Sequence, residues 1–172
     1  MRHADGHHDP RDAQDGAGDS AHLGRLNLLL SYAGWEDQPW VERLPRLLEP
    51  MGIRSLHARC GREATEVINT EPVHIAIVDL GLPLDRDAAS GPAGAKLLEV
   101  LRRLEQPPPT VVVREPRTQR ENARDLAAAL KVGAFAVVHR PRASADLELM
   151  LELMRRVLQR HYQGRWPGGP TL

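Results

Sequence analysis

The segment Val73–Pro83, which reads VHIAIVDLGLP, decides the fold of this chain. Its first part, Val73–Leu80, is a nearly continuous apolar run that is rich in β-branched residues. Such a run is typical of a strand covered on both faces, because a half-exposed strand would alternate apolar and polar residues. Strands covered on both faces occur in parallel sheets that are flanked by helices.

The rest of the chain supplies further strands and helices around this segment. Short apolar runs predict strands over Leu26–Leu30, Ile53–Ala58, Thr110–Val113 and Ala134–His139. Apolar residues at helical spacing predict helices over about 39–51, 62–69, 97–104, 118–133 and 144–161. Strand and helix therefore alternate along the chain, which predicts an α/β domain with a parallel sheet and helices on both faces.

Two segments interrupt this regular order. Pro45 lies inside the first predicted helix and is expected to kink or interrupt it. Leu84–Gly94 contains two glycines and a proline and is expected to form a long polar loop.

The composition argues against several classes of protein. Basic and acidic residues each number 23, and this zero net charge argues against a protein that coats nucleic acid. The hydrophobic fraction of 41% suffices for one core, but no apolar run could span a membrane. The single cysteine, Cys60, excludes a disulfide framework and is expected to be structural. The N-terminus lacks the apolar stretch of a secretory signal, so we expect a cytoplasmic protein.

The charge is unevenly divided between an N-terminal tail and the rest. Residues 1–22 hold five aspartates, four histidines and two arginines, and are expected to be disordered. Their formal charge of −3 leaves +3 on the remainder of the neutral chain. We predict a folded domain over residues 23–161 and a C-terminal tail over 162–172.

The ends of the predicted strands indicate where a functional site would lie. In open parallel sheets, sites form at the carboxyl ends of the strands. That rule selects Ser31 and Tyr32, Asp79, Arg114, and Arg140 after His139.

These strand ends resemble those of the receiver domain of bacterial two-component response regulators. The resemblance covers residues 25–161 and rests chiefly on Val78–Pro83, where Asp79 is the first residue of a D-x-x-x-P pattern. Gly133-Ala134 and Arg140-Pro141 around the fifth strand match as well. The resemblance implies a flavodoxin-like fold with strand order 2-1-3-4-5. It also implies that Asp79 corresponds to the phosphoacceptor and that a sensor kinase is a possible partner.

The residues that support phosphoryl transfer in receivers are replaced here. Receivers hold a divalent cation with the aspartate and two acids at the end of the first strand. Ser31 and Tyr32 occupy those positions and supply no carboxylate, so neither magnesium nor another cofactor is expected. Glu36 and Asp37 could substitute only if their loop folded back.

Two further receiver positions are occupied by arginine. Arg114 replaces the small hydroxyl residue after strand four, and Arg140 replaces the lysine after strand five. We expect Asp79 to be held in an ion pair by Arg140, with Arg114 as a second candidate. The alternative is a metal-independent phosphate site in which the arginines replace the cation.

The last predicted helix carries two apolar stripes. One contains Leu147, Met150, Leu151, Met154 and Leu158, and the second contains Leu149, Leu153 and Val157. We expect the second stripe to form a homodimer interface, since three large aliphatic residues in line are seldom exposed on a monomer. A deep groove that buries both stripes is the alternative.

The remaining features of the sequence indicate no activity beyond the one implied by the strand ends. Arginines near residues 114–142 are interleaved with acids, and no DNA-recognition motif is present, so direct DNA binding is not expected. Trp40 is expected to pack in the first helix, while Trp35 could cover the vacated metal position. The leading prediction is a stand-alone, non-catalytic receiver-like module that acts through protein contacts. The alternatives are a functional phospho-receiver and a small flavodoxin-like enzyme or ligand-binding protein.

Overall fold

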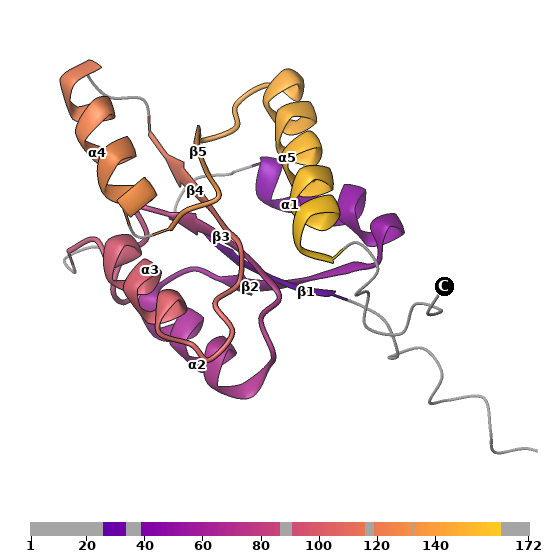
Figure 1. The fold of residues 1–172 in the computed structure, drawn as a ribbon, viewed down its shortest axis with the longest axis horizontal. Coiled ribbons are helices and arrows are strands. Elements are labelled where there is room, and N and C mark those ends of the chain that lie inside the picture. The colour runs from indigo at the N-terminus through magenta and orange to yellow at the C-terminus, as the bar shows by residue number, and fades with distance from the viewer. Residues whose placement is uncertain (1–25, 34–38, 87–90, 116–118, 132, 163–172) are drawn as a thin grey trace, which may run out of the picture.

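The computed structural model describes residues 26–33, 39–86, 91–115, 119–131 and 133–162 (Figure 1). Five parallel strands form one sheet in the order β2-β1-β3-β4-β5, which confirms the predicted strand order. The strands are β1 (Leu26–Ser31), β2 (Ile53–Ala58), β3 (Ile75–Asp79), β4 (Thr110–Arg114) and β5 (Ala136–His139). The α-helices are α1 (Pro39–Leu48), α2 (Gly61–Thr70), α3 (Gly94–Arg102), α4 (Gln119–Lys131) and α5 (Ser144–Tyr162), and a 3-10 turn, η1 (Glu49–Met51), follows α1.

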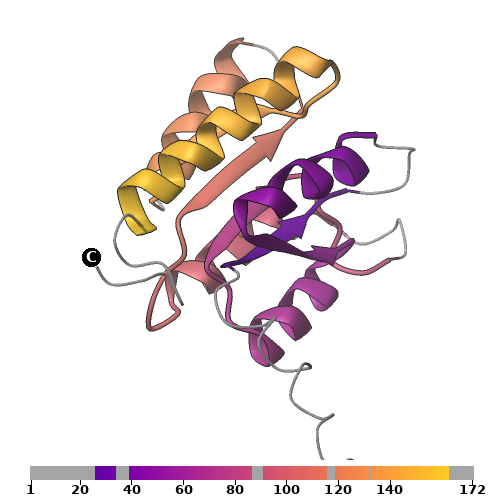
Figure 2. The ribbon, with the colours of Figure 1, turned by 90° about the vertical axis from the view of Figure 1, so that its right-hand side faces the viewer.

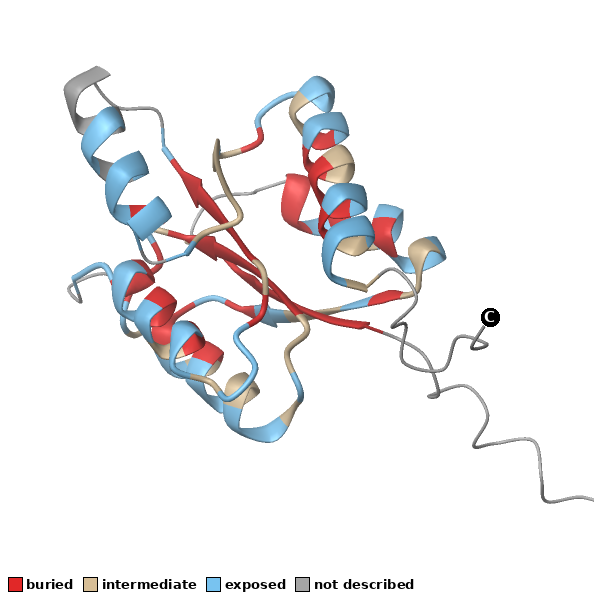
Figure 3. Ribbon diagram, viewed as in Figure 1, coloured by how far each residue is buried: buried red, intermediate tan, exposed pale blue. Residues whose placement is uncertain are grey.

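Helices cover both faces of the sheet (Figures 1 and 2). Successive residues of the inner strand β1 point to opposite faces, so Leu28 and Leu30 pack with α1 and α5. Leu29 packs on the other face with residues of α2, α3 and α4. Because helices lie on both faces, β1, β3 and β4 are fully buried along their length (Figure 3).

The first helix continues through Pro45, so the expected interruption at this residue is wrong. Proline removes one helical N–H, but only three residues of α1 follow Pro45. The short 3-10 turn η1 then completes the helix end, and Gly52 follows with a positive φ of 76°.

Strand β5 begins two residues later than predicted. The N–H of Ala134 donates to the carbonyl of Ala129 at 3.0 Å, so Ala134 still closes the end of α4. Gly133 reverses the chain there with a φ of 84°, a conformation that favours glycine.

The predicted interface stripe on α5 is wrong for two of its three residues. Leu153 is 9% exposed and Val157 is fully buried, and both belong to the core with α1 and the sheet. Only Leu149, at 53%, is exposed. The helix lies in a groove between the sheet and α1, so it buries a broad apolar surface rather than a single stripe.

The predicted tails and Trp35 lie outside the described residues, except that α5 extends through Tyr162. Within the described residues, no helix is both long and apolar enough to cross a membrane.

His74 joins the amino ends of β1 and β3 to the end of α5. Its Nδ1 atom accepts a hydrogen bond of 2.9 Å from the backbone N–H of Asn27. Its carbonyl oxygen accepts a hydrogen bond from the Tyr162 hydroxyl. Burial lowers the pKa of His74 below its ordinary value of 6.5, and it raises the pKa of Tyr162.

Stability should therefore fall as the pH drops below about 6.5, because the unfolded chain binds a proton that folded His74 resists. Protonation also destroys the acceptor for Asn27, so we expect His74 to account for a loss of about 1 kcal/mol. Urea denaturation at about pH 7.5 and about pH 5 measures this change. The decrease in the free energy of unfolding between these two pH values should be smaller in His74→Gln. It should be unchanged in the control His139→Gln, because His139 is exposed. Equal decreases in both variants would contradict the assignment to His74.

Candidate functional site

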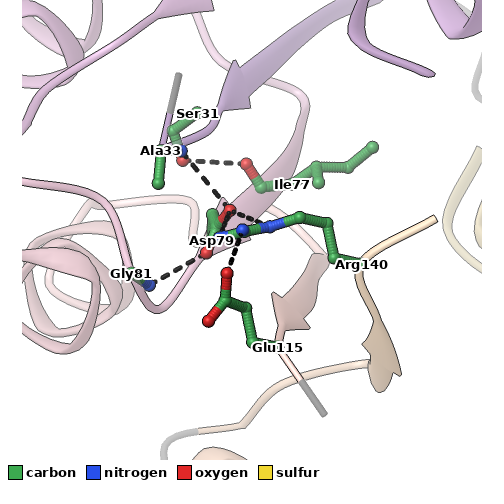
Figure 4. Close-up of polar contacts among 7 residues, drawn as sticks. All are labelled: Ser31, Ala33, Ile77, Asp79, Gly81, Glu115 and Arg140. Carbon is green, nitrogen blue, oxygen red and sulfur yellow. Dashed lines mark hydrogen bonds and ion pairs between the residues drawn. The ribbon is translucent and has the colours of Figure 1, made fainter. Parts of the chain in front are cut away.

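The carboxyl ends of β1 and β3 and the residue after β5 meet at one edge of the sheet (Figure 4). Asp79 is the last residue of β3, Ser31 is the last residue of β1, and Arg140 directly follows β5. The parallel arrangement brings them together, since all strands end at the same edge. The Asp79 side chain is 1% exposed and is the buried centre of this site.

Both carboxylate oxygens of Asp79 already have hydrogen-bond donors. Oδ2 accepts from Arg140 Nε at 3.1 Å and Nη2 at 2.8 Å, and from the Ala33 N–H at 3.4 Å. Oδ1 accepts from the Gly81 N–H at 2.9 Å. A buried carboxylate that is paired and hydrogen-bonded in this way needs no further ligand to remain charged.

Arg140 reaches its position because the chain continues straight out of β5. Its N–H donates to the Arg114 carbonyl at 2.7 Å, which extends the β4–β5 ladder by one residue. Its side chain then crosses β4 to reach β3 and is 11% exposed. Nη1 donates to Glu115 Oε1 at 2.5 Å, so the guanidinium is held between two carboxylates (Figure 4).

Arg114 does not share the role of Arg140. The expected ion pair is present with Arg140, and among the described residues no contact joins Arg114 to Asp79. Arg114 is 9% exposed, and its carbonyl oxygen contributes to the site by fixing the Arg140 backbone.

Ser31 and Tyr32 supply no carboxylate at the end of β1. The Ser31 hydroxyl donates to the Ile77 carbonyl at 2.9 Å and is fully buried. The Tyr32 hydroxyl accepts from Arg59 Nε at 3.2 Å, and its ring contacts His57 edge-on. Burial, and then the nearby Arg59 charge, lower the pKa of His57.

The described residues around Asp79 provide few of the ligands that a magnesium ion prefers. Magnesium prefers an octahedral shell of oxygens, usually with one or two free carboxylates. Asp79 is the carboxylate at the end of β3, and Arg140 and two backbone N–H groups occupy its oxygens. In the described part of the chain, no three His, Cys, Asp or Glu side chains group together at metal-binding distance. Glu36 and Asp37 lie outside the described residues.

The segment after Asp79 is fixed by backbone hydrogen bonds. The Leu82 N–H donates to the Asp79 carbonyl at 3.1 Å, and the Ala93 N–H donates to the Leu82 carbonyl at 2.6 Å. Pro83 and Pro92 form an antiparallel bridge, so the described ends of the predicted loop lie side by side. The geometry around Gly81 is therefore set by the fold.

Sequence reasoning missed three of the partners of this site. The Ala33 and Gly81 contacts use backbone N–H groups, which carry no side-chain signal. Glu115 follows Arg114 at the end of β4, and its position at a strand end was the available signal. Trp40 is 3% exposed within the core, as expected for packing of the first helix, and Cys60 is 2% exposed.

Comparison with solved structures shows which fold this is. No family model matches the chain, and no curated protein matches its sequence. A two-component response regulator from Clostridium difficile is 18% identical with a TM-score of 0.62, covering 80% of this chain and 99% of that chain. A CheY-like receiver domain protein from Methanospirillum hungatei JF-1 is 19% identical with a TM-score of 0.59, covering 81% and 99%.

A third similar structure carries a modified aspartate. It is a response regulator protein from Burkholderia pseudomallei with a phosphorylated aspartic acid, a calcium ion and citrate. It is 20% identical with a TM-score of 0.55, and the match covers 80% of this chain and 74% of that chain. The chain therefore has the flavodoxin-like fold of receiver domains.

Proposed function

We propose that this chain is a two-component receiver domain of an atypical kind, which acts through protein contacts and without phosphorylation of Asp79. The observation that carries this proposal is the Asp79–Arg140 ion pair at 2.8 Å. Arg140 donates two hydrogen bonds to Oδ2 of Asp79, so this oxygen would have to exchange partners before it could take up a phosphoryl group. Its guanidinium already provides the positive charge that a bound metal cation would otherwise place next to the carboxylate.

The proposed mode of action needs no catalytic residue in this chain. Phosphoryl transfer to an aspartate requires a bound cation to neutralise the charge on the transferred group. Ser31 and Tyr32 supply no carboxylate for one. On this proposal the protein works in the cytoplasm as a binding module, with its carboxyl-edge site fixed in one state.

Incubation of the full chain with acetyl phosphate or beryllofluoride, with and without magnesium, should give no stoichiometric adduct at Asp79. Intact-protein mass spectrometry detects an acyl phosphate, and fluorine NMR detects bound beryllofluoride. The Arg140→Lys variant should react no better, since it restores the receiver lysine but not the two missing acids. A magnesium-dependent adduct on the unmodified chain would overturn the proposal and establish the second candidate, a functional phospho-receiver.

That second candidate is favoured by one observation. Asp79 stands at the carboxyl end of β3, where a phosphoacceptor would be needed, and one similar structure contains a phosphorylated aspartic acid. If Asp79 reacted without magnesium, Arg140 rather than a metal ion would neutralise the charge of the phosphoryl group.

We further propose that the protein contact is a homodimer through the edge of the sheet at β5. The helices α4 and α5 flank this edge, and most of the described part of α4 is exposed (Figures 1 and 3). Three leucines on these helices are exposed, namely Leu126 at 40%, Leu130 at 53% and Leu149 at 53%. Exposed leucines near one sheet edge support an interface, although two of the three originally expected residues are buried.

The variant Leu130→Glu should convert the dimer to a monomer, because the charge would have to be buried at the interface. Light scattering coupled to size-exclusion chromatography measures the mass. The matched control is Leu47→Glu on α1, where a leucine is 44% exposed on a different surface. A monomeric unmodified chain, or an unchanged dimer in Leu130→Glu, would count against this interface.

A further inference from the structure

A cavity of about 320 Å³ lies between α2 and α3, apart from the Asp79 site. Residues from α2, from the segment after β3 and from α3 line it, including Thr65, Leu84, Asp85, Lys96, Leu97 and Val100. Its volume is at the lower end of the range of pockets that bind small molecules. Nothing in the proposed function uses this cavity.

Main-chain hydrogen bonds fix the walls of the cavity. The first turn of α2 donates to the segment after Asp79, from the Gly61 N–H to the Pro83 carbonyl at 2.8 Å and from the Arg62 N–H to the Leu84 carbonyl at 3.2 Å. Helix N-termini normally leave such groups to water or a side-chain cap. Here the wall from α2 and the wall from the segment after β3 are joined through their backbones, so this side of the cavity is formed before any ligand enters.

The interior of the cavity is predominantly apolar. Leu97 and Val100 come from one side of α3, and Leu84 closes the cavity from the loop. Leu84 is 44% exposed although it is a leucine, so part of its side chain is left to water at the mouth. A bound apolar group would remove that surface from water, which is the usual source of affinity in such pockets.

Among the described residues that line the cavity, the charges sum to one positive charge. Arg62 pairs with Asp85 at 2.7 Å, and these two charges offset each other. Lys96 is exposed, and among the described residues it makes no hydrogen bond or ion pair. An apolar cavity with one available cation at its edge matches a ligand with an apolar body and a single negative charge.

We propose that the cavity between α2 and α3 binds a small monocarboxylic acid with an apolar body. The carboxylate lies at the Lys96 ammonium, and the body packs against Leu84, Leu97 and Val100. The two parts of the ligand are thus recognised by different groups, which separate probes can test. This proposal does not depend on whether Asp79 is phosphorylated.

Titration of the isotope-labelled full chain with octanoate, followed by amide NMR shifts, tests the site. Octanoate should give saturable shifts at Leu84, Leu97 and Val100 with a millimolar dissociation constant, the range expected for so small a ligand. Octanol has the same body without the charge and should bind about threefold more weakly; acetate has only the charge and should give no saturable shifts. The absence of saturable octanoate shifts at these residues, or equal binding of octanol and octanoate, would overturn the proposal.

Two variants separate the head and the body of the ligand. Lys96→Gln should weaken octanoate about threefold and leave octanol unchanged. Lys131→Gln is its matched control, since Lys131 is the other lysine of the chain and lies outside this cavity. Val100→Trp fills the cavity from a partly exposed position and should abolish binding of both probes while the remaining NMR spectrum stays dispersed. Unaltered octanoate binding in a folded Val100→Trp protein would place the ligand elsewhere and overturn the proposal.

Discussion

Replacing Arg140 by methionine should lower the free energy of unfolding by about 3–5 kcal/mol. The substitution leaves the Asp79 carboxylate, which is 1% exposed, without its cation and without two of its hydrogen bonds. A buried charge that loses its only ionic partner costs far more than an exposed ion pair contributes. Urea denaturation monitored by circular dichroism measures the difference.

Arg142→Met is the matched control for this prediction. Arg142 is exposed two residues further along, and its recorded contact to Asp146 uses the backbone N–H, which methionine retains. The free energy of unfolding of Arg142→Met should differ from that of the unmodified chain by no more than about 0.5 kcal/mol. If Arg140→Met behaved like this control, the ion pair would not be holding Asp79.

A double variant tests whether the cost comes from the uncompensated charge. Asp79→Asn combined with Arg140→Met removes both charges and keeps the carboxylate shape. The double variant should be more stable than Arg140→Met alone, because replacing both members of a buried pair is tolerated far better than removing one. Lower stability of the double variant would show instead that the uncompensated Asp79 charge is not the source of the cost.

Replacing Gly94 by alanine should cost about 3 kcal/mol or prevent folding, the upper end of the effect of an overpacked core. A Cβ atom at this position would lie 2.4 Å from the Asp79 carbonyl oxygen and 2.6 Å from the Leu80 Cα atom. Both are backbone atoms at the carboxyl end of β3, so no side chain can move aside. The start of α3 would have to shift away from the sheet, and with it the segment that holds Gly81 against Asp79.

Gly91→Ala provides the control for this substitution. A Cβ atom there would meet nothing within 4 Å, so the change should be neutral or stabilise slightly by restricting the unfolded chain. Thermal unfolding of the two variants under the same conditions measures the contrast. Equal midpoints for Gly94→Ala and the unmodified chain would mean that α3 does not approach β3 so closely.

Much of the fold follows from the pattern of apolar residues. The run in Val73–Pro83 indicated a strand covered on both faces, and β3 is buried along its whole length with helices on each side. The meeting of Asp79 and Arg140 could also be predicted, since parallel strands end at the same edge and opposite charges there attract. Arg114 satisfied the same reasoning and yet is not the partner, because strand position alone does not say where a side chain points.

The wrong expectations about α5 and the missed contacts to Asp79 concern properties that the local sequence does not determine. The apolar stripes of α5 showed which residues can be buried, but not how much of the helix the sheet and α1 together would cover. Leu153 and Val157 are therefore core residues. The contacts from Ala33 and Gly81 to Asp79 arise from backbone groups and depend on loop geometry alone.

The ion pair between Arg140 and Asp79 has a consequence when the protein unfolds locally. Strand β5 has only four residues and lies at the sheet edge, where local unfolding is easiest. Detachment of β5 would carry Arg140 away and so uncover the Asp79 carboxylate in the same event. The rate at which any reagent reaches this carboxylate is then limited by how often β5 detaches from the sheet. Local unfolding of β5 therefore controls the reactivity of Asp79.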